Sequence, residues 1–270
     1  MSEVSAVSSL AAICIYPVKS CAGTSVRRAR VTKRGLVGDR RYMIVDDAGR
    51  FFTQREEPGL QNVRPVWGDG GFRLTTAAGE VAVPSVLDAG QPCEVQVWDS
   101  TCAALVHAPG SELLSELFAR PLRLVYMPDT ELRAVDPDYG RADDIVSFAD
   151  GFPLLLLNEA SLAELNRHLP RRVGMDRFRG NVIVDGASAY QEDALGRVKI
   201  GELEFRSVKP CSRCAVVNVD PARGVREDRE PLSTLVETHA PAGKPLFGAN
   251  LIPESEGEIE VGARVTLPDG

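Results

Sequence analysis

The sequence is poor in histidine, in aromatic residues and in long apolar runs. Its 270 residues include three histidines, and aromatic residues make up 6%. No segment approaches the roughly 18 consecutive apolar residues that a membrane-spanning helix needs, so we expect no membrane span. Basic residues are not in excess either, because the net charge is -7 and the pI is about 5.2. A nucleic acid or an anionic membrane surface is therefore not expected as a partner.

Signals for secretion and for a disulfide framework are also missing. The N-terminal stretch MSEVSAVSSLAAICIYP has Glu3 and no basic residue before its short apolar segment, unlike a secretory signal peptide. Six cysteines in a chain of this length do not resemble the framework of a small secreted domain. We therefore expect a reducing, cytoplasmic setting, with disulfide pairing as the alternative.

The rest of the composition is that of an ordinary folded protein. Hydrophobic residues make up 44% of the chain and charged residues 26%, which is typical of globular proteins. The length suits one large domain or two compact domains, and either arrangement provides enough residues for a substantial core.

The first half of the chain has the pattern of short strands separated by turns. Within residues 11–107, YMIV (42–45), DDAG (46–49) and RFFTQ (50–54) predict a β-hairpin. A helix is predicted only from Ser111, where SELLSELFAR carries its leucines and its phenylalanine on one stripe. Pro121 ends that helix.

The second half begins near residues 122–128 and combines strands with one helix. LLLL (154–157) fits a buried strand, and Asn158 has the side chain of an N-cap for the helix EASLAELNRHL. NVIVDG, VKIGELEF, AVVNVD and the alternating EIEVGARVTLP are predicted as strands. The sequence thus predicts two β-rich units with few helices, divided near residues 120–125.

Two cysteines three residues apart, in KPCSRC (209–214), are the first candidates for chemistry. A structural zinc site needs four ligands, but this pair supplies two and no second pair exists. A thioredoxin-like redox pair would precede a helix, whereas AVVNVD after Cys214 has a strand pattern. Plain buried cysteines, zinc, a redox pair and ligation of another metal all stay open. Lys209 and Arg213 favour the thiolate, which is the form that binds soft metals.

Basic side chains gather in four short segments of this acidic chain, at 16–23, 38–56, 175–186 and 209–214. Ammonium and guanidinium groups bind phosphate and carboxylate, so together the segments predict one convergent anion site. Each segment alone also fits ordinary surface charge. Glycine-rich phosphate loops, dinucleotide fingerprints and nucleophile elbows do not occur in the sequence. The candidate basic side chains within these segments are Lys19, Arg40, Arg41, Arg55, Arg177, Arg179, Lys209 and Arg213.

Seven segments, taken in chain order, resemble the MOSC-domain proteins that carry an N-terminal MOSC β-barrel domain. They are IYPVKSCAG, GLVGDRRYMIVD, TQRE, FRGNVIVDG, KPCSRCAVVNVDP, EPLSTL and PLFGANL. Within that family the sequence is most similar to bacterial relatives of the mitochondrial amidoxime-reducing component. The resemblance implies a mainly β fold with some helices (α+β): an N-terminal β-barrel-like domain over residues 1–122, a MOSC β-barrel domain over residues 123–270, and a cofactor cleft between them.

The resemblance further implies a molybdenum cofactor (Mo-molybdopterin), in which a pyranopterin dithiolene and one protein cysteine hold the metal. The family's ligand is the second cysteine of the CSRC-type motif, which corresponds to Cys214. The family's cofactor-contacting loop corresponds to residues 150–152, where the family often has a hydroxyl residue in place of Phe152. The cofactor-binding positions that the resemblance implies are Lys19, Ser20, Arg40, Gly151, Phe152, Arg179, Asn181, Ser212 and Arg213.

The activity that the resemblance implies is reduction of N-hydroxylated compounds, such as amidoximes, hydroxylamines and N-hydroxylated bases, by two-electron oxygen transfer at molybdenum. Asn218 and Asp220, on one face of the strand expected after Cys214, are predicted to line the substrate side, with turn formation as the alternative. No four-cysteine cluster motif follows, so a separate electron donor of ferredoxin, flavoprotein reductase or cytochrome b5 type is expected. A non-catalytic carrier of the cofactor or its sulfur is the alternative function.

Overall fold

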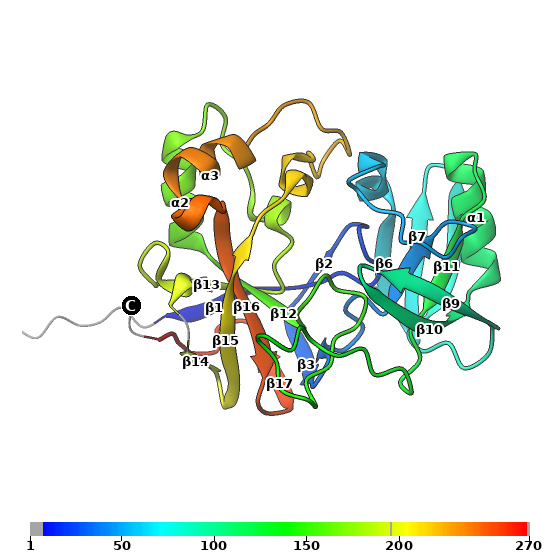
Figure 1. Ribbon diagram of the computed structural model, residues 1–270, viewed down its shortest axis with the longest axis horizontal. Coiled ribbons are helices and arrows are strands. Elements are labelled where there is room, and N and C mark those ends of the chain that lie inside the picture. The colour runs from blue at the N-terminus through cyan, green and yellow to red at the C-terminus, as the bar shows by residue number, and fades with distance from the viewer. Residues whose placement is uncertain (1–7, 195, 269–270) are drawn as a thin grey trace, which may run out of the picture.

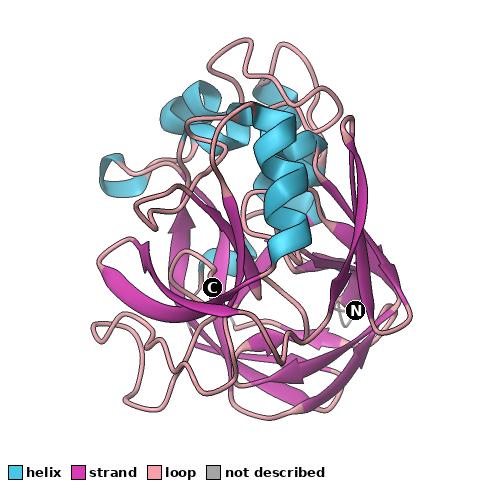
Figure 2. Cartoon of the chain, turned by 90° about the vertical axis from the view of Figure 1, so that its right-hand side faces the viewer, coloured by secondary structure: helices cyan, strands magenta, loops and turns pink. Residues whose placement is uncertain are grey.

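Strands make up most of the regular structure. The protein is described here by a computed structural model, which covers residues 8–194 and 196–268. Four sheets share the strands, and the α-helices lie toward the top of both views, at the left and at the right of Figure 1 (Figure 1, Figure 2). The expected mainly β fold with some helices is confirmed; the sheets curve as in a barrel but do not close.

The largest sheet has eight strands in the order β18-β14-β15-β16-β12-β13-β1-β2. All but the β12–β13 pair are antiparallel. The inward side chains of this sheet join those of β3, β4 and β17 in one apolar core. The strands of this sheet are β1 (Ser9–Ile15), β2 (Thr24–Val26), β12 (Leu154–Asn158), β13 (Val182–Asp185), β14 (Gly196–Ile200), β15 (Leu203–Ser212), β16 (Leu246–Pro253) and β18 (Val265–Thr266).

Three smaller sheets complete the β structure, and two of them form the lobe on the right of Figure 1. The first of these two is β5 (Tyr42–Val45), β11 (Arg123–Tyr126), β10 (Ser100–Val106) and β9 (Gln91–Val97). The second is β6 (Arg64–Gly68), β7 (Gly71–Thr76) and β8 (Gly79–Pro84). The remaining sheet is β17 (Gly257–Glu260), β3 (Arg28–Thr32) and β4 (Gly35–Leu36), which lies nearer the centre.

The helices are short and lie outside the sheets. The α-helices are α1 (Ala108–Phe118), α2 (Glu159–His168) and α3 (Leu232–Thr238). The 3-10 helices are η1 (Pro58–Asn62), η2 (Met175–Phe178), η3 (Gln191–Asp193), η4 (Ala215–Asn218) and η5 (Pro241–Gly243). The N-cap prediction is confirmed, because the Asn158 side chain accepts a hydrogen bond from the backbone N–H of Ala160 at 3.0 Å. In the described part of the chain, no helix combines the length and apolar character needed to cross a membrane.

The domain boundary expected between residues 122 and 123 stays a prediction, and the sheets combine strands from both sides of it. Strand β11 pairs with β5 and β10, so it belongs with the first-half strands. Conversely, β1 pairs with β13, and β3 pairs with β17, so residues 9–36 complete the sheets of the second half. Each lobe therefore takes strands from both sides of the expected boundary, which local strand patterns could not indicate.

Two local predictions are wrong in detail. RFFTQ does not form the second arm of a full hairpin, because Phe51 makes only an isolated bridge to Val45. AVVNVD is not a strand: η4 begins directly after Cys214, and Asp220 makes an isolated bridge to Val225. The apolar run predicts a strand, but Val217 is buried from within η4 and Val219 is buried directly after it.

Candidate functional site

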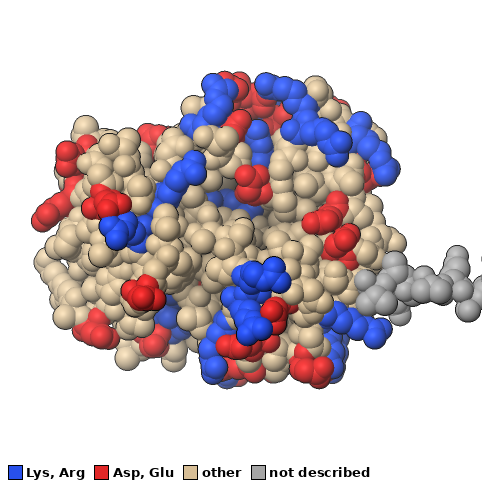
Figure 3. Space-filling view, turned by 180° about the vertical axis from the view of Figure 1, so that it is seen from behind, with Lys and Arg blue, Asp and Glu red and all other residues tan. Residues whose placement is uncertain are grey.

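One pocket brings together all the residues expected at the cofactor. It lies where the loops after β1, β4 and η2 meet the loop before β12 and the end of β15, and it holds about 850 Å³ of space including its open mouth. A hollow with basic side chains inside it is visible near the middle of the molecule in Figure 3. The predicted positions that line the pocket are Lys19, Ser20, Arg40, Gly151, Phe152, Arg179, Asn181, Ser212, Arg213 and Cys214.

The Cys214 thiol is exposed in this pocket and carries no disulfide. The residue follows β15 and is the N-cap of η4, with extended backbone. Cys211 is half-buried and also unpaired, and its sulfur accepts a hydrogen bond from Arg213 Nη1 at 3.1 Å. Among residues 8–194 and 196–268, no three His, Cys, Asp or Glu side chains gather in a group that could hold a metal ion.

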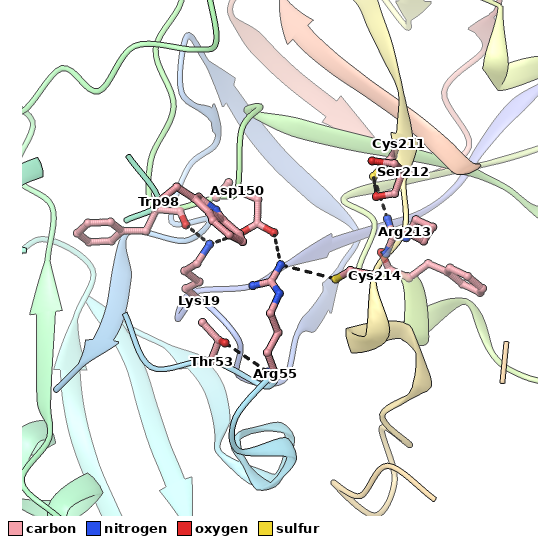
Figure 4. A network of polar contacts seen from close by, with 12 residues as sticks. Lys19, Thr53, Arg55, Trp98, Asp150, Cys211, Ser212, Arg213 and Cys214 are labelled. Atoms are coloured by element: carbon pink, nitrogen blue, oxygen red, sulfur yellow. Dashed lines mark hydrogen bonds and ion pairs between the residues drawn. The ribbon is translucent and has the colours of Figure 1, made fainter. Parts of the chain in front are cut away.

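Arg55 connects the two lobes across the pocket (Figure 4). It comes from the loop before η1, and its Nη2 lies 3.6 Å from Cys214 Sγ and 3.4 Å from Asp150 Oδ2. The guanidinium also stacks over the Trp98 ring, 4.6 Å from the ring centroid. Trp98 Nε1 in turn donates to Asp150 Oδ1 at 3.3 Å. One side chain thus places positive charge beside the thiol and beside an acidic group.

A buried carboxylate, Asp39, organises the floor of the pocket. Its oxygens accept hydrogen bonds from the backbone N–H of Tyr16 at 2.8 Å, from Arg40 Nη1 at 2.7 and 2.9 Å, and from Asn181 Nδ2 at 3.0 Å. Asn181 Oδ1 accepts from Arg40 and from the backbone of Leu155. Asn181 is 2% exposed, and both the oxygen and the nitrogen of its amide are hydrogen-bonded within the protein. In this structure the side chain therefore holds Arg40 and Asp39 in place beside β12.

Two cations at the pocket have no acidic partner among the described residues. Arg179 Nη1 reaches the neutral Gln61 Oε1 at 3.3 Å, and Arg213 Nη2 donates to the Phe178 carbonyl at 2.7 Å. Neither side chain forms an ion pair in the part of the chain that the structure describes, and the buried Arg213 Nε has no hydrogen-bond partner there. The pocket therefore offers uncompensated positive charge within reach of an anionic ligand.

Left-handed backbone is concentrated at this pocket. Ser20, Arg40 and Arg179 have φ values of 68°, 47° and 56°, in the region that favours glycine. Non-glycine residues in this conformation are strained by order 1–3 kcal/mol each and are found most often at functional sites. Each of the three lines the pocket, so the strained turns point their side chains toward it.

Family models match both halves of the chain: the MOSC N-terminal beta barrel domain over residues 7–121 and the MOSC domain over residues 143–266. The chain belongs to the MOSC-domain family. Human mitochondrial amidoxime-reducing component 1 is 32% identical to this MOSC-domain protein, with 97% of this chain and 83% of the relative covered. Human mitochondrial amidoxime reducing component 2 is 29% identical, with 95% and 82% covered. Molybdenum cofactor sulfurase of rice is 31% identical over 93% of this chain, but only 33% of its own length is covered.

Two residues predicted on the substrate side of this MOSC-domain protein do not line the Cys214 pocket. Asn218 Oδ1 accepts from the backbone of Leu232 at 3.1 Å, and Asp220 caps the backbone of Ala222 and lies 3.7 Å from Arg177. Asn218 and Asp220 line a neighbouring pocket with Arg177 instead. The expected placement failed because it assumed a strand, whereas η4 turns these side chains away from the thiol.

The convergent anion site also takes fewer cations than the sequence suggested. Arg41 pairs with Asp129 at 2.7 Å, and the Lys209 ammonium lies over the Tyr139 ring at 4.1 Å; neither lines the pocket. Asp39 and Trp98, which no sequence pattern indicated, make hydrogen bonds to Arg40 and Asp150 at the site. The only local signal for Asp39 was its position between Gly38 and Arg40, and nothing in the sequence marked Trp98.

A pH-dependent contribution to stability is expected from Asp150. Its pKa lies well below the ordinary value: desolvation by the surrounding protein raises this pKa even though the side chain is 59% exposed, but the charge and hydrogen bond of Lys19, and then the charge of Arg55, outweigh it. Because the folded pKa lies below the unfolded value of about 3.9, the stabilisation is present above that pH and is lost as the pH falls below it. Lys19 is 5% exposed and also donates to the Phe148 carbonyl at 2.8 Å, so it depends on this carboxylate for compensation.

The variant Asp150→Asn is therefore expected to lose about 1 kcal/mol of unfolding free energy at pH 7, because the buried Lys19 ammonium loses its charged partner while solvent at the 59% exposed carboxylate screens the pair. Urea unfolding of the cofactor-free protein at a series of pH values measures this. The difference between wild type and variant should be constant from pH 7 to about 4 and should shrink only as the pH falls further. A difference that stays unchanged from about pH 4 to about pH 2 would show that the carboxylate charge is not what stabilises the fold.

Proposed function

We propose that the pocket binds the molybdenum cofactor with the Cys214 thiolate as its protein ligand to the metal. The observation that carries this proposal is an exposed, unpaired thiol in one pocket with cations from both lobes. A thiolate is a soft ligand suited to such a metal, and the free positive charge of Arg179 and Arg213 suits an anionic pterin tail. The donor set therefore fits that cofactor.

The other residues that line the pocket would contribute to cofactor binding in different ways. Lys19 and Arg40 have carboxylate partners and would contribute their remaining donors to the cofactor's phosphate and pterin. Ser20, Ser212 and the open loop at Gly151 add neutral polar groups and backbone close to the same space. Phe152 lines the pocket with an aromatic ring, which packs near Tyr139 and would provide an apolar wall.

We further propose that the protein is a reductase of N-hydroxylated compounds. When bound, the cofactor supplies two-electron redox chemistry at the metal. Reduction of each N–OH group consumes two electrons and two protons. The N–O bond breaks, the oxygen leaves as water and an N–H bond forms. Arg55 places positive charge beside the Cys214 sulfur, which stabilises negative charge there. Asp150, whose pKa lies below its ordinary value, stays ionised and holds Lys19 and Arg55 rather than giving up a proton.

Electrons are proposed to come from a separate redox protein, of ferredoxin, flavoprotein reductase or cytochrome b5 type. The names of the amidoxime-reducing relatives support a small N-hydroxylated substrate. Six unpaired thiols agree with the reducing, cytoplasmic setting inferred from the sequence, which stays a prediction.

A second candidate function is a carrier of the cofactor or of its sulfur. The similarity to molybdenum cofactor sulfurase of rice over 93% of this chain favours it, because the same pocket could hold the cofactor without turning it over. The thiol and the cations would serve both functions equally well, so only an assay separates them.

The test uses purified protein whose molybdenum and pterin contents have been measured. A chemically reduced dye supplies electrons, and benzamidoxime is the substrate. Production of benzamidine by the loaded protein supports the reductase. A protein that carries one molybdenum per chain but makes no benzamidine supports the carrier, and a protein that carries zinc and no pterin contradicts both.

A further inference from the structure

The ring of Tyr16 lies against two guanidinium groups of the pocket. Arg40 Cζ is 4.3 Å and Arg179 Cζ is 4.4 Å from the centre of this one ring. Tyr16 is 3% exposed and does not line the pocket itself, so it cannot be a direct ligand of anything bound there. Its position underneath two pocket cations requires another explanation.

Two like charges do not approach one ring without compensation. Asp39 neutralises Arg40, but Arg179 has no ion-pair partner among residues 8–194 and 196–268. Burial is the largest cause of the lowered pKa of Arg179, and the nearby charge of Arg40 lowers this pKa as well. The negative face of an aromatic ring attracts a cation at such distances, so Tyr16 supplies compensation to both guanidiniums without adding a formal charge to the site.

The position of the ring is fixed from several sides. The backbone N–H of Tyr16 donates to Asp39 Oδ1 at 2.8 Å, and its carbonyl accepts from the backbone of Arg40 at 2.7 Å. A Cβ atom at Gly23 would lie 2.5 Å from Tyr16 Cε1, so only glycine leaves room for the ring where it is. The Tyr16 backbone and ring therefore pack closely with Arg40 and Arg179 behind the residues that line the pocket.

We propose that Tyr16 is a positioning residue, which uses the faces of its ring to hold Arg40 and Arg179 ready for the anionic end of the cofactor. This inference rests on the proposed function, since it assumes that the pocket binds the cofactor. Without the ring, the two guanidiniums would repel each other and move apart, and binding would have to bring them back together. The expected consequence is faster loss of cofactor rather than loss of the fold.

The experiment compares the variants Tyr16→Phe and Tyr16→Leu in the full chain, produced with molybdate. The release of pterin during dialysis is followed by the fluorescence of the oxidised pterin. Tyr16→Phe keeps the ring and should release pterin less than about twofold faster than wild type, whereas Tyr16→Leu should release it about tenfold faster. Rescue by phenylalanine separates the ring from the hydroxyl group.

Tyr126→Leu is the matched control. Tyr126 is 1% exposed and also lies beneath a guanidinium, that of Arg41 at 5.0 Å, but it lines no part of the pocket. Its replacement should lower the thermal midpoint and leave the rate of pterin release unchanged. If Tyr16→Leu accumulates no folded protein, Gly23→Ala displaces the ring without deleting it and should speed release in the same way.

Three results would overturn the inference. Tyr16→Leu or Gly23→Ala could release pterin at the wild-type rate, Tyr16→Phe could release it as fast as Tyr16→Leu, or Tyr126→Leu could release it as fast as either. A wild-type protein that contains neither molybdenum nor pterin would instead overturn the proposed function, and the inference with it. The two failures are therefore distinguishable.

Discussion

Replacing Cys214 with alanine is expected to remove benzamidoxime reduction almost completely. The fall should exceed about 100-fold, which is the upper end of the effect when a residue that only supports a metal ligand is lost. The reason is that the exposed Cys214 sulfur is the thiolate proposed to bind the metal, and the half-buried Cys211 sulfur is already in contact with Arg213. Molybdenum per chain, pterin fluorescence and turnover are measured on the same preparation.

Two cysteine variants serve as comparisons for this prediction. Cys93→Ala, in the other lobe and away from the pocket, should match wild type in all three measurements. Cys211→Ala should lose far less activity than Cys214→Ala, because it removes an acceptor for Arg213 rather than the ligand. Pterin is expected to be retained in part by Cys214→Ala through the pocket cations. Full activity in Cys214→Ala, or greater loss in Cys211→Ala, would contradict the assignment of the ligand.

Asp39→Ala is expected to have the largest effect on stability, lowering the unfolding free energy by about 3–5 kcal/mol, the range for breaking a buried ion pair from one side. The Asp39 side chain is 1% exposed and that of Arg40 is 12% exposed, so the guanidinium would stay buried with its charge uncompensated. The backbone N–H of Tyr16 and the Asn181 amide would lose an acceptor as well. Urea unfolding at pH 7 measures the change.

The control for this prediction is an exposed ion pair. Glu80 and Arg73 have side chains 50% and 61% exposed, and Glu80→Ala should cost less than about 1 kcal/mol. We also expect Asp39→Ala to be purified with little pterin, since Arg40 and Asn181 lose their common anchor. Equal costs for the two variants would show that Asp39 does not organise the pocket floor.

Much of the candidate site could be predicted because its members are chemically unusual for their surroundings. Lys19, Arg40, Arg179 and Arg213 stood out as cations in an acidic chain, and Cys214 stood out as one of two closely spaced thiols. The ordered set of motifs then linked segments that local reasoning could only treat separately. All these side chains do line one pocket, although their roles at the cofactor stay predictions.

The substrate side could not be predicted in the same way. Asn218 and Asp220 were placed by the alternation of an apolar run, but η4 replaced the strand because its valines could be buried from a helical turn as well. Arg55 and Trp98 were missed as partners of Asp150 because their contacts join segments far apart in sequence.

The sequence by itself determined the local features: short alternating strands, the N-cap at Asn158 and the chemical types available for a metal and an anion. These depend on neighbouring residues, which set backbone preference and side-chain periodicity. Only the tertiary structure decided that residues 9–36 complete the second lobe and that Arg55 reaches Cys214, 159 positions away. Such contacts depend on which strands pair across the whole chain, and a one-residue change of register would turn every side chain to the opposite face.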